Sequence, residues 1–170
     1  MKKIYAPWRH DYVTKMSKQN KKDITKHECV FCAQVQEGQD DKYFIIRRFA
    51  HSFVMMNLYP YNAGHVMILP YDHKGNLADL TPLIRAEMME VVSVTERVMT
   101  EVLKAEGYNV GINLGIAGGG GIPAHIHIHV LPRWKGDTNF LETIGQTKLI
   151  SADLVKTFND LKEGFASVTL

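Results

Sequence analysis

The apolar positions of this chain recur with two different periods, which predict several strands and one long helix. Turn residues separate short apolar, β-prone runs at residues 43–47, 52–57, 65–69 and 108–114. Thr81 is an N-cap residue followed by proline, so we expect a helix from there to about Ala105, ended by Gly107. Apolar residues at steps of three and four predict a buried stripe on this helix, made of Ile84, Met88, Val91, Thr95, Val98 and Val102.

A further strand is predicted at residues 125–132, where histidine alternates with β-branched residues. Because successive side chains of a strand point to opposite faces, His125, His127 and His129 share one face. We expect this face to do chemistry and the opposite face to pack, through Ile126, Ile128 and Val130. The alternative is an incidental, tag-like histidine cluster on an exposed strand.

The elements follow in the order β β β α β β α, which indicates an α+β fold. We expect a small antiparallel sheet that carries one long helix on a face. The apolar spacing of residues 153–164 adds a short C-terminal helix. The 170 residues are most simply one domain, 1–170, in which the polar residues 1–41 form a wrapping arm.

Composition narrows the choice of partners. The formal net charge is +2 and charged residues make up 22% of the chain, so we expect no nucleic-acid polymer as a ligand. The lysine-rich residues 15–26 are read as a solvated loop. We find no signal-peptide pattern and no apolar run of membrane-spanning length, so we expect a cytoplasmic protein without a membrane partner.

Four consecutive glycines, residues 118–121, lie in the segment that leads into the histidines. Glycine lets backbone N–H groups approach an anion and tolerates the positive φ angles of an anion-binding nest. A phosphate cradle and a flexible hairpin loop are both consistent with the glycines themselves. The position directly before the histidine segment favours the cradle.

The two cysteines, Cys29 and Cys32, form a C-x-x-C motif. In a reducing compartment this spacing indicates metal binding or redox chemistry more than a structural disulfide.

The histidine segment resembles the signature of the histidine triad (HIT) family. The similarity extends to residues 52–57, 62–70 and 72–73, and covers about Cys29 to Trp134. Two end motifs, at residues 6–9 and 132–140, are similar to a microbial branch that includes diadenosine tetraphosphate phosphorylases related to the fragile histidine triad hydrolases.

The resemblance implies a homodimer in which two five-stranded antiparallel sheets join, and nucleotidyl transfer through a covalent histidine intermediate. A neutral imidazole suits this role because it is a competent nucleophile near pH 7. By resemblance His127 is the nucleophile, the backbone near His125 fixes its tautomer, and His129 hydrogen-bonds the scissile phosphate or the leaving group. The developing negative charge would meet backbone donors of the loop, at Gly119, Gly120, Gly121 and Ile122.

The resemblance also implies three positions around the nucleotide. Asn57 matches the family residue that touches the ribose hydroxyls. Asn113 matches, with a one-residue gap, a glutamine that contacts phosphate. His65 matches a histidine near the pocket, for which a purely structural role is an equal alternative.

A zinc site is implied as well, by Cys29, Cys32, His73 and His125. Two thiolates and two imidazoles form a closed tetrahedral set, so this zinc would be structural and would supply no catalytic water. The alternative is a pair of reduced cysteines and an unligated His125. His51 is a substitute for His73, whereas His10 and His27 are expected to be exposed. No organic cofactor is expected.

The leading functional hypothesis is an enzyme that cleaves dinucleoside polyphosphates, such as diadenosine tetraphosphate or triphosphate. Its nucleotidyl-His127 intermediate would be resolved by inorganic phosphate or by water, and the end motifs favour phosphate. Two alternatives are a nucleoside phosphoramidate hydrolase and a non-catalytic nucleotide sensor.

Overall fold

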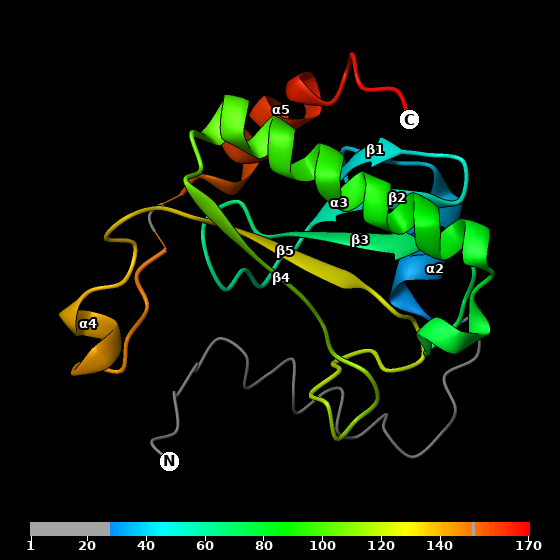
Figure 1. Cartoon of the computed structure of the whole chain (residues 1–170), viewed down its shortest axis with the longest axis horizontal. Coiled ribbons are helices and arrows are strands. Elements are labelled where there is room, and N and C mark those ends of the chain that lie inside the picture. Colours follow the sequence, from blue (N-terminus) through cyan, green and yellow to red (C-terminus); the bar gives the residue numbers. More distant parts are fainter. Residues whose placement is uncertain (1–27, 151) are drawn as a thin grey trace.

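A computed structural model describes residues 28–150 and 152–170 of the chain. The strands of these residues are β1 Ile45–Arg48, β2 Ser52–Met56, β3 Val66–Pro70, β4 Gly107–Ile112 and β5 Ile128–Arg133. They form one antiparallel sheet in the order β1-β2-β3-β5-β4. The helices are α2 Val30–Glu37, α3 Pro82–Leu103, α4 Phe140–Thr143 and α5 Leu154–Gly164, with a 3-10 turn, η2, at Leu77–Asp79. Figure 1 shows α3 running along the sheet and α4 standing apart from it. The predicted α+β class, its five-stranded antiparallel sheet, long helix and short C-terminal helix are confirmed.

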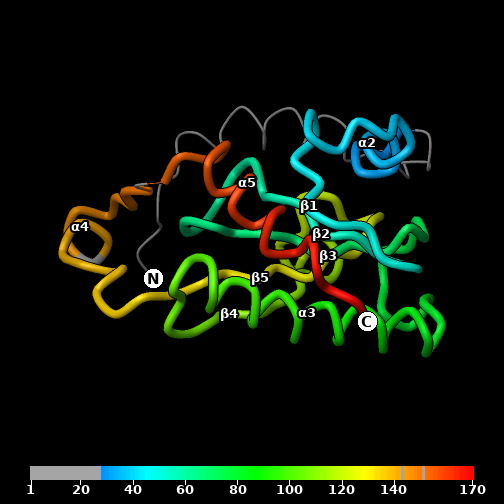
Figure 2. Tube along the Cα trace, turned by 90° about the horizontal axis from the view of Figure 1, so that it is seen from above, coloured from blue at the N-terminus to red at the C-terminus, as the bar shows by residue number. Residues whose placement is uncertain are grey.

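Strand β2 shows how the sheet divides the interior into two sides. Val54 and Met56 enter the main core cluster, together with residues of α3 and α5, whereas Phe53 and Met55 enter a second cluster with Phe31 of α2. All residues of β2 and β3 are buried, and Figure 2 shows α3 and α2 on opposite sides of these strands. The α2 side of the sheet carries the site described below.

Helix α3 begins as the sequence predicts and ends differently. The Thr81 hydroxyl accepts a hydrogen bond from the N–H of Ile84 at 3.3 Å, and Pro82 occupies the first turn. The predicted stripe is buried apart from Val102, which is partly buried, and each buried apolar side chain of this size contributes about 1.5–3 kcal/mol. The helix ends at Leu103 and is followed by Lys104, which has a left-handed φ of 55°, whereas Gly107 opens β4. No helix of the described residues is long and apolar enough to cross a membrane.

The histidine segment enters the sheet later than predicted, because β5 begins only at Ile128. The N–H of Ile126 donates instead to the carbonyl of Lys74, at 2.7 Å. The predicted alternation still holds, since the apolar residues of the segment are buried in the main core: Ile126, Ile128 and Val130. The histidines face the other side, where Phe31 contacts the rings of His125 and His127.

The predicted wrapping arm, residues 1–41, contains a helix that the sequence reading missed. Helix α2 begins after Cys29 and ends at Gly38, whose φ of 68° is the left-handed conformation that glycine adopts readily. The remaining part of the arm, residues 1–27, lies outside the described residues, and so do the basic cluster, His10 and His27. The assignment of residues 1–170 to one domain therefore stays a prediction.

Candidate active site

A cavity of about 320 Å³ lies on the α2 side of the sheet, within the size range of small-molecule sites. It brings together several of the site residues predicted from the sequence, namely Asn57, Asn113, Gly121, Ile122, His127 and His129. The remaining wall is mainly apolar and consists of Val30, Phe31, Gln34, Met55, Met56, Leu58, Tyr59, Tyr61 and Met67. The cavity therefore combines an apolar lining with a few convergent polar groups.

The proton of the His127 ring is fixed by the backbone. His127 Nδ1 lies 2.9 Å from the carbonyl oxygen of His125, and because a carbonyl can only accept, Nδ1–H is the donor. His127 is only 7% exposed, and this burial lowers the pKa of His127, while the bond to the backbone raises it. A neutral ring protonated at Nδ1 carries its lone pair on Nε2, the form that a nucleophile requires.

A second chain of hydrogen bonds fixes the proton of His129. The N–H of Tyr61 donates to His65 Nδ1 at 3.1 Å, so the proton of a neutral His65 is on Nε2. Burial lowers the pKa of His65 to about 3, and the rings of His129 and His127 add to this effect, so His65 is neutral at pH 7. Its Nε2–H points to His129 Nδ1 at 2.9 Å. His129 therefore accepts at Nδ1 and holds its own proton on Nε2, as a donor.

The two predicted asparagines lie next to these histidines. Asn57 is buried; its side-chain oxygen accepts from the N–H of Tyr59 at 2.9 Å, and its nitrogen lies 3.4 Å from both ring nitrogens of His65. The Asn113 side-chain amide lies beside His129 Nε2, with its nitrogen 3.4 Å away. Because His129 Nε2 carries a proton, the Asn113 amide accepts from it through its oxygen once the two amide atoms are exchanged. Both asparagines thus lie at the wall of the cavity, each beside one of the histidines.

The glycine loop differs in part from the prediction. The N–H of Gly119 donates to the carbonyl of Ile116 at 3.0 Å, and the N–H of Gly120 donates to that of Gly115 at 3.1 Å. These two donors are engaged within the loop itself. Of the four loop residues predicted to contact phosphate, Gly121 and the buried Ile122 line the cavity.

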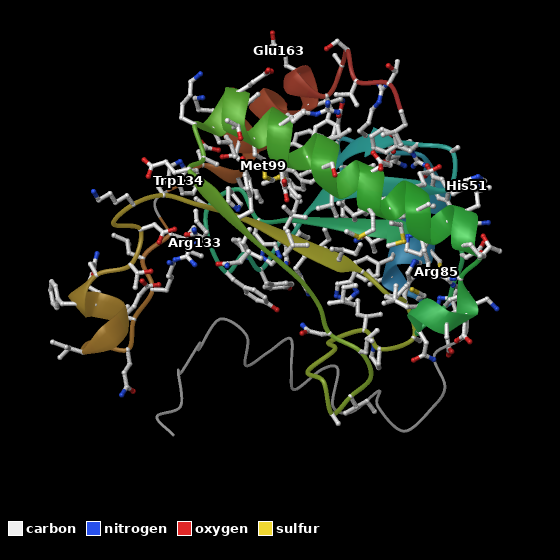
Figure 3. All side chains as sticks on the ribbon, viewed as in Figure 1. His51, Arg85, Met99, Arg133, Trp134 and Glu163 are labelled. Carbon is white, nitrogen blue, oxygen red and sulfur yellow. The ribbon has the colours of Figure 1, made fainter. Side chains whose placement is uncertain are left out.

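The turn that carries Tyr61 and His65 is anchored to the end of β5. The Asn62 amide donates to the carbonyl of Pro132 at 2.8 Å and to the Asp137 carboxylate at 3.0 Å. Arg133 also donates to this carboxylate, at 2.7 Å, and the Arg133 guanidinium, a backbone N–H and Asn62 hold the pKa of Asp137 well below its ordinary range. Figure 3 shows Arg133 and Trp134 at the end of the sheet near α4, away from His51 and Arg85.

The four predicted metal ligands converge. Their ligand atoms, from Cys29, Cys32, His73 and His125, all lie within 4.8 Å of one another, and the two cysteines form no disulfide. His125 Nδ1 lies 3.4 Å from the sulfur of Cys29 and 3.5 Å from that of Cys32, and His73 Nδ1 lies 3.5 Å from Cys32. Sulfur and nitrogen ligands of a tetrahedral zinc lie about 3.6 Å apart, from the usual bond lengths.

The tautomer of His125 also suits a metal. His125 Nε2 lies 2.9 Å from the carbonyl oxygen of Pro70, so Nε2–H donates and Nδ1 presents its lone pair to the sulfurs. His51 does not belong to this cluster; its backbone N–H donates to the Glu87 carboxylate at 2.8 Å. Among the described residues, His73 is therefore the second imidazole of a site that could bind a metal ion.

Among the wall residues that sequence reasoning missed are Phe31, Gln34 and Tyr61. Phe31 packs edge-on against His125 and His127, with ring centroids 5.6 and 5.5 Å away. Tyr61 lies against the rings of His65 and His129. The spacing of residues 30, 31, 34 and 35 before Gly38 was the available signal for a helix that faces the site.

Comparison with known proteins gives consistent matches. Residues 38–136 match the HIT domain. The chain is 34% identical over 150 residues to the AP-4-A phosphorylase of Mycobacterium tuberculosis (strain H37Rv), which is 88% of this chain and 77% of that protein. It is 31% identical to a bis(5'-nucleosyl)-tetraphosphatase (asymmetrical) of Schizosaccharomyces pombe, over 65% of this chain and 57% of that protein. A crystal structure of a Zn-bound histidine triad family protein from Mycobacterium smegmatis has a TM-score of 0.70 and 28% identity, and covers 84% of this chain and 96% of that one.

Proposed function

The chain belongs to the HIT domain family, and from this premise we propose that it cleaves dinucleoside polyphosphates by way of a nucleotidyl group on His127. The observation that carries the proposal is the bond from His127 Nδ1–H to the His125 carbonyl, because it places the lone pair on Nε2 at the wall of a ligand-sized cavity.

The reaction follows from the proton positions on the two histidines. His127 Nε2 attacks the α-phosphorus of diadenosine tetraphosphate, an N–P bond forms, and the bond from that phosphorus to its bridging oxygen breaks. ATP leaves with the electron pair, and His129 Nε2–H hydrogen-bonds the oxygen that becomes negative. An oxygen of inorganic phosphate then attacks the adduct, the N–P bond breaks, and ADP leaves.

The same placement of the nucleotide gives the neighbouring residues their binding roles. We propose that Asn57 binds the ribose hydroxyls and that Asn113 and the backbone of Gly121 and Ile122 bind the phosphates. His65 would hold the His129 ring in position. Backbone N–H groups near a reacting phosphate stabilise the charge that develops in the transition state.

Inorganic phosphate is the acceptor that we favour over water. The relative named AP-4-A phosphorylase aligns with 88% of the chain, whereas the relative named tetraphosphatase aligns with 65%. Chromatography of the products from diadenosine tetraphosphate distinguishes the two reactions. With phosphate present, we expect ADP plus ATP; AMP plus ATP identifies a hydrolase, and loss of turnover on every dinucleotide refutes the proposal.

The same assay tests the alternatives. Rapid release of AMP and amine from an adenosine phosphoramidate, without cleavage of dinucleotides, would identify a phosphoramidate hydrolase. Nucleotide binding with no turnover of any of these substrates would identify a sensor.

We also propose that the Cys29, Cys32, His73 and His125 cluster holds a structural zinc. The donor set is the one that zinc prefers, and the separations match a tetrahedral ion. The ion would tie α2 to the segment before β5. Elemental analysis of protein purified without chelator should give about one zinc per chain; a value near zero contradicts the site.

A homodimer is proposed through β4, which is an edge of the sheet. Val110 of β4 and Leu114 just beyond it are 43% and 44% exposed, and an exposed apolar edge strand favours pairing with another chain. Light scattering after gel filtration should give twice the chain mass, and Val110→Lys should lower it to one chain mass.

A further inference from the structure

Gln34 of α2 places an unmatched acceptor at the cavity. Its side-chain oxygen, Oε1, is buried and has no hydrogen-bond partner within the described part of the chain. Gln34 also lines the cavity that contains His127 and His129. Buried polar atoms are nearly always hydrogen-bonded, so such an oxygen indicates a donor that arrives with a ligand or a water molecule.

The surroundings of Gln34 suit a flat apolar ring. Val30 lies four residues earlier, on the same face of α2, and Met55 and Met67 of the sheet line the same cavity. Methionine and valine side chains offer an aromatic ring dispersion contacts but no hydrogen bonds. The Gln34 amide is the group of this wall that can read the polar edge of such a ring.

A nucleotide bound for reaction at His127 directs its base away from that histidine. Phe31 contacts the His127 ring, and Gln34 lies three residues beyond Phe31, about 4.5 Å along the helix axis. The base is the apolar end of a nucleotide, and α2 supplies apolar wall at this end. The amide is therefore placed at the edge of the base and not at the phosphates.

We propose that Gln34 determines base specificity and selects a 6-aminopurine over a 6-oxopurine. This inference rests on the proposed function, because it takes the ligand to be a nucleotide. A glutamine amide matches adenine, whose 6-amino group donates to Oε1 while N7 accepts from the amide nitrogen. On this same edge, hypoxanthine and guanine present acceptors at both O6 and N7, so one of these faces Oε1 in either orientation of the amide.

The test compares diadenosine and diinosine tetraphosphate, which differ in the amino and oxo groups at position 6. We expect the wild type to favour the diadenosine compound in kcat/KM by about tenfold or more. Gln34→Leu should bring this ratio close to one. Gln34→Glu keeps an acceptor for the amino group. The charge of the glutamate should lower kcat/KM for both substrates, but the preference for adenine should remain. Gln36→Leu, two residues further along the same helix, is the matched control and should leave the ratio unchanged.

A binding measurement separates this inference from the reaction. Calorimetry of AMP and IMP with His127→Ala, alone and combined with Gln34→Leu, reports base preference without turnover. A preference for AMP that Gln34→Leu removes supports Gln34 even if no dinucleotide is cleaved. Cleavage with the same base ratio in wild type and Gln34→Leu overturns the inference and leaves the proposed function intact.

Discussion

Replacing His65 by leucine tests whether a chain of hydrogen bonds sets the proton of His129. In the wild type, the Tyr61 N–H donates to His65 Nδ1 at 3.1 Å, and His65 Nε2 lies 2.9 Å from His129 Nδ1. Leucine fills the buried space but neither accepts nor donates. The proton of His129 is then no longer restricted to Nε2, where the proposed reaction needs it.

The size of the effect follows from the bonds that are lost. Two buried hydrogen bonds contribute about 0.5–1.5 kcal/mol each, and their unsatisfied partners add to the loss, so the free energy of unfolding should fall by about 2–4 kcal/mol. A positioned proton donor contributes about 10²–10⁴-fold to a rate. His129 itself stays in place, so we expect a smaller loss in kcat, about tenfold, for diadenosine tetraphosphate.

The assay uses two substrates with different demands for proton donation. The amine of an adenosine phosphoramidate needs a proton to leave, whereas ATP leaves from diadenosine tetraphosphate as an anion, so His65→Leu should slow cleavage of the phosphoramidate much more than that of diadenosine tetraphosphate. His65→Gln is the control, since an amide can accept from Tyr61 and donate to His129. Equal losses on both substrates would show that His65 has only a structural role.

Three further predictions concern other parts of the site. His127→Ala should lower kcat by more than about 10³-fold while nucleotide still binds, and intact mass spectrometry should show a nucleotidyl adduct on the wild type only. Cys32→Ala should lose the zinc and lower the melting temperature, whereas His51→Ala should keep the metal; equal zinc content in both variants would disprove the ligand set. Asp137→Asn should destabilise the fold at neutral pH. Because the folded state lowers the pKa of Asp137, its stabilisation is present above the unfolded pKa of about 3.9 and is lost in acid, so denaturation curves of wild type and variant should converge as the pH falls.

The features that the sequence predicted correctly depend on local periodicity. The helix from Thr81 and the alternation around His127 follow from the directions of neighbouring side chains, which the backbone fixes within a few residues. The strand boundary at Ile128 could not be predicted, because it depends on the carbonyl of Lys74, a residue distant in sequence that captures the N–H of Ile126.

The wall formed by α2 was missed for a different reason. Residues 30–37 lie in a polar, lysine-rich context and form a helix of only eight residues, whose stability comes from packing of Phe31 and Cys32 and not from propensity. The glycine loop shows the same limit. Four consecutive glycines indicate that backbone N–H groups can approach an anion. The residue types do not reveal that the N–H groups of Gly119 and Gly120 donate to carbonyls of the same loop.

His125 links the proposed metal site to His127, the proposed nucleophile, so a structural ion would affect catalysis. Its Nδ1 faces the cysteine sulfurs, its Nε2–H is held by the carbonyl of Pro70, and its own carbonyl fixes the proton of His127. A metal ion bound at Nδ1 would therefore restrain His125, whose backbone carbonyl orients the His127 ring, although the ion would touch no reacting atom. Loss of the metal should consequently lower kcat less than His127→Ala does, and should leave the reaction products unchanged.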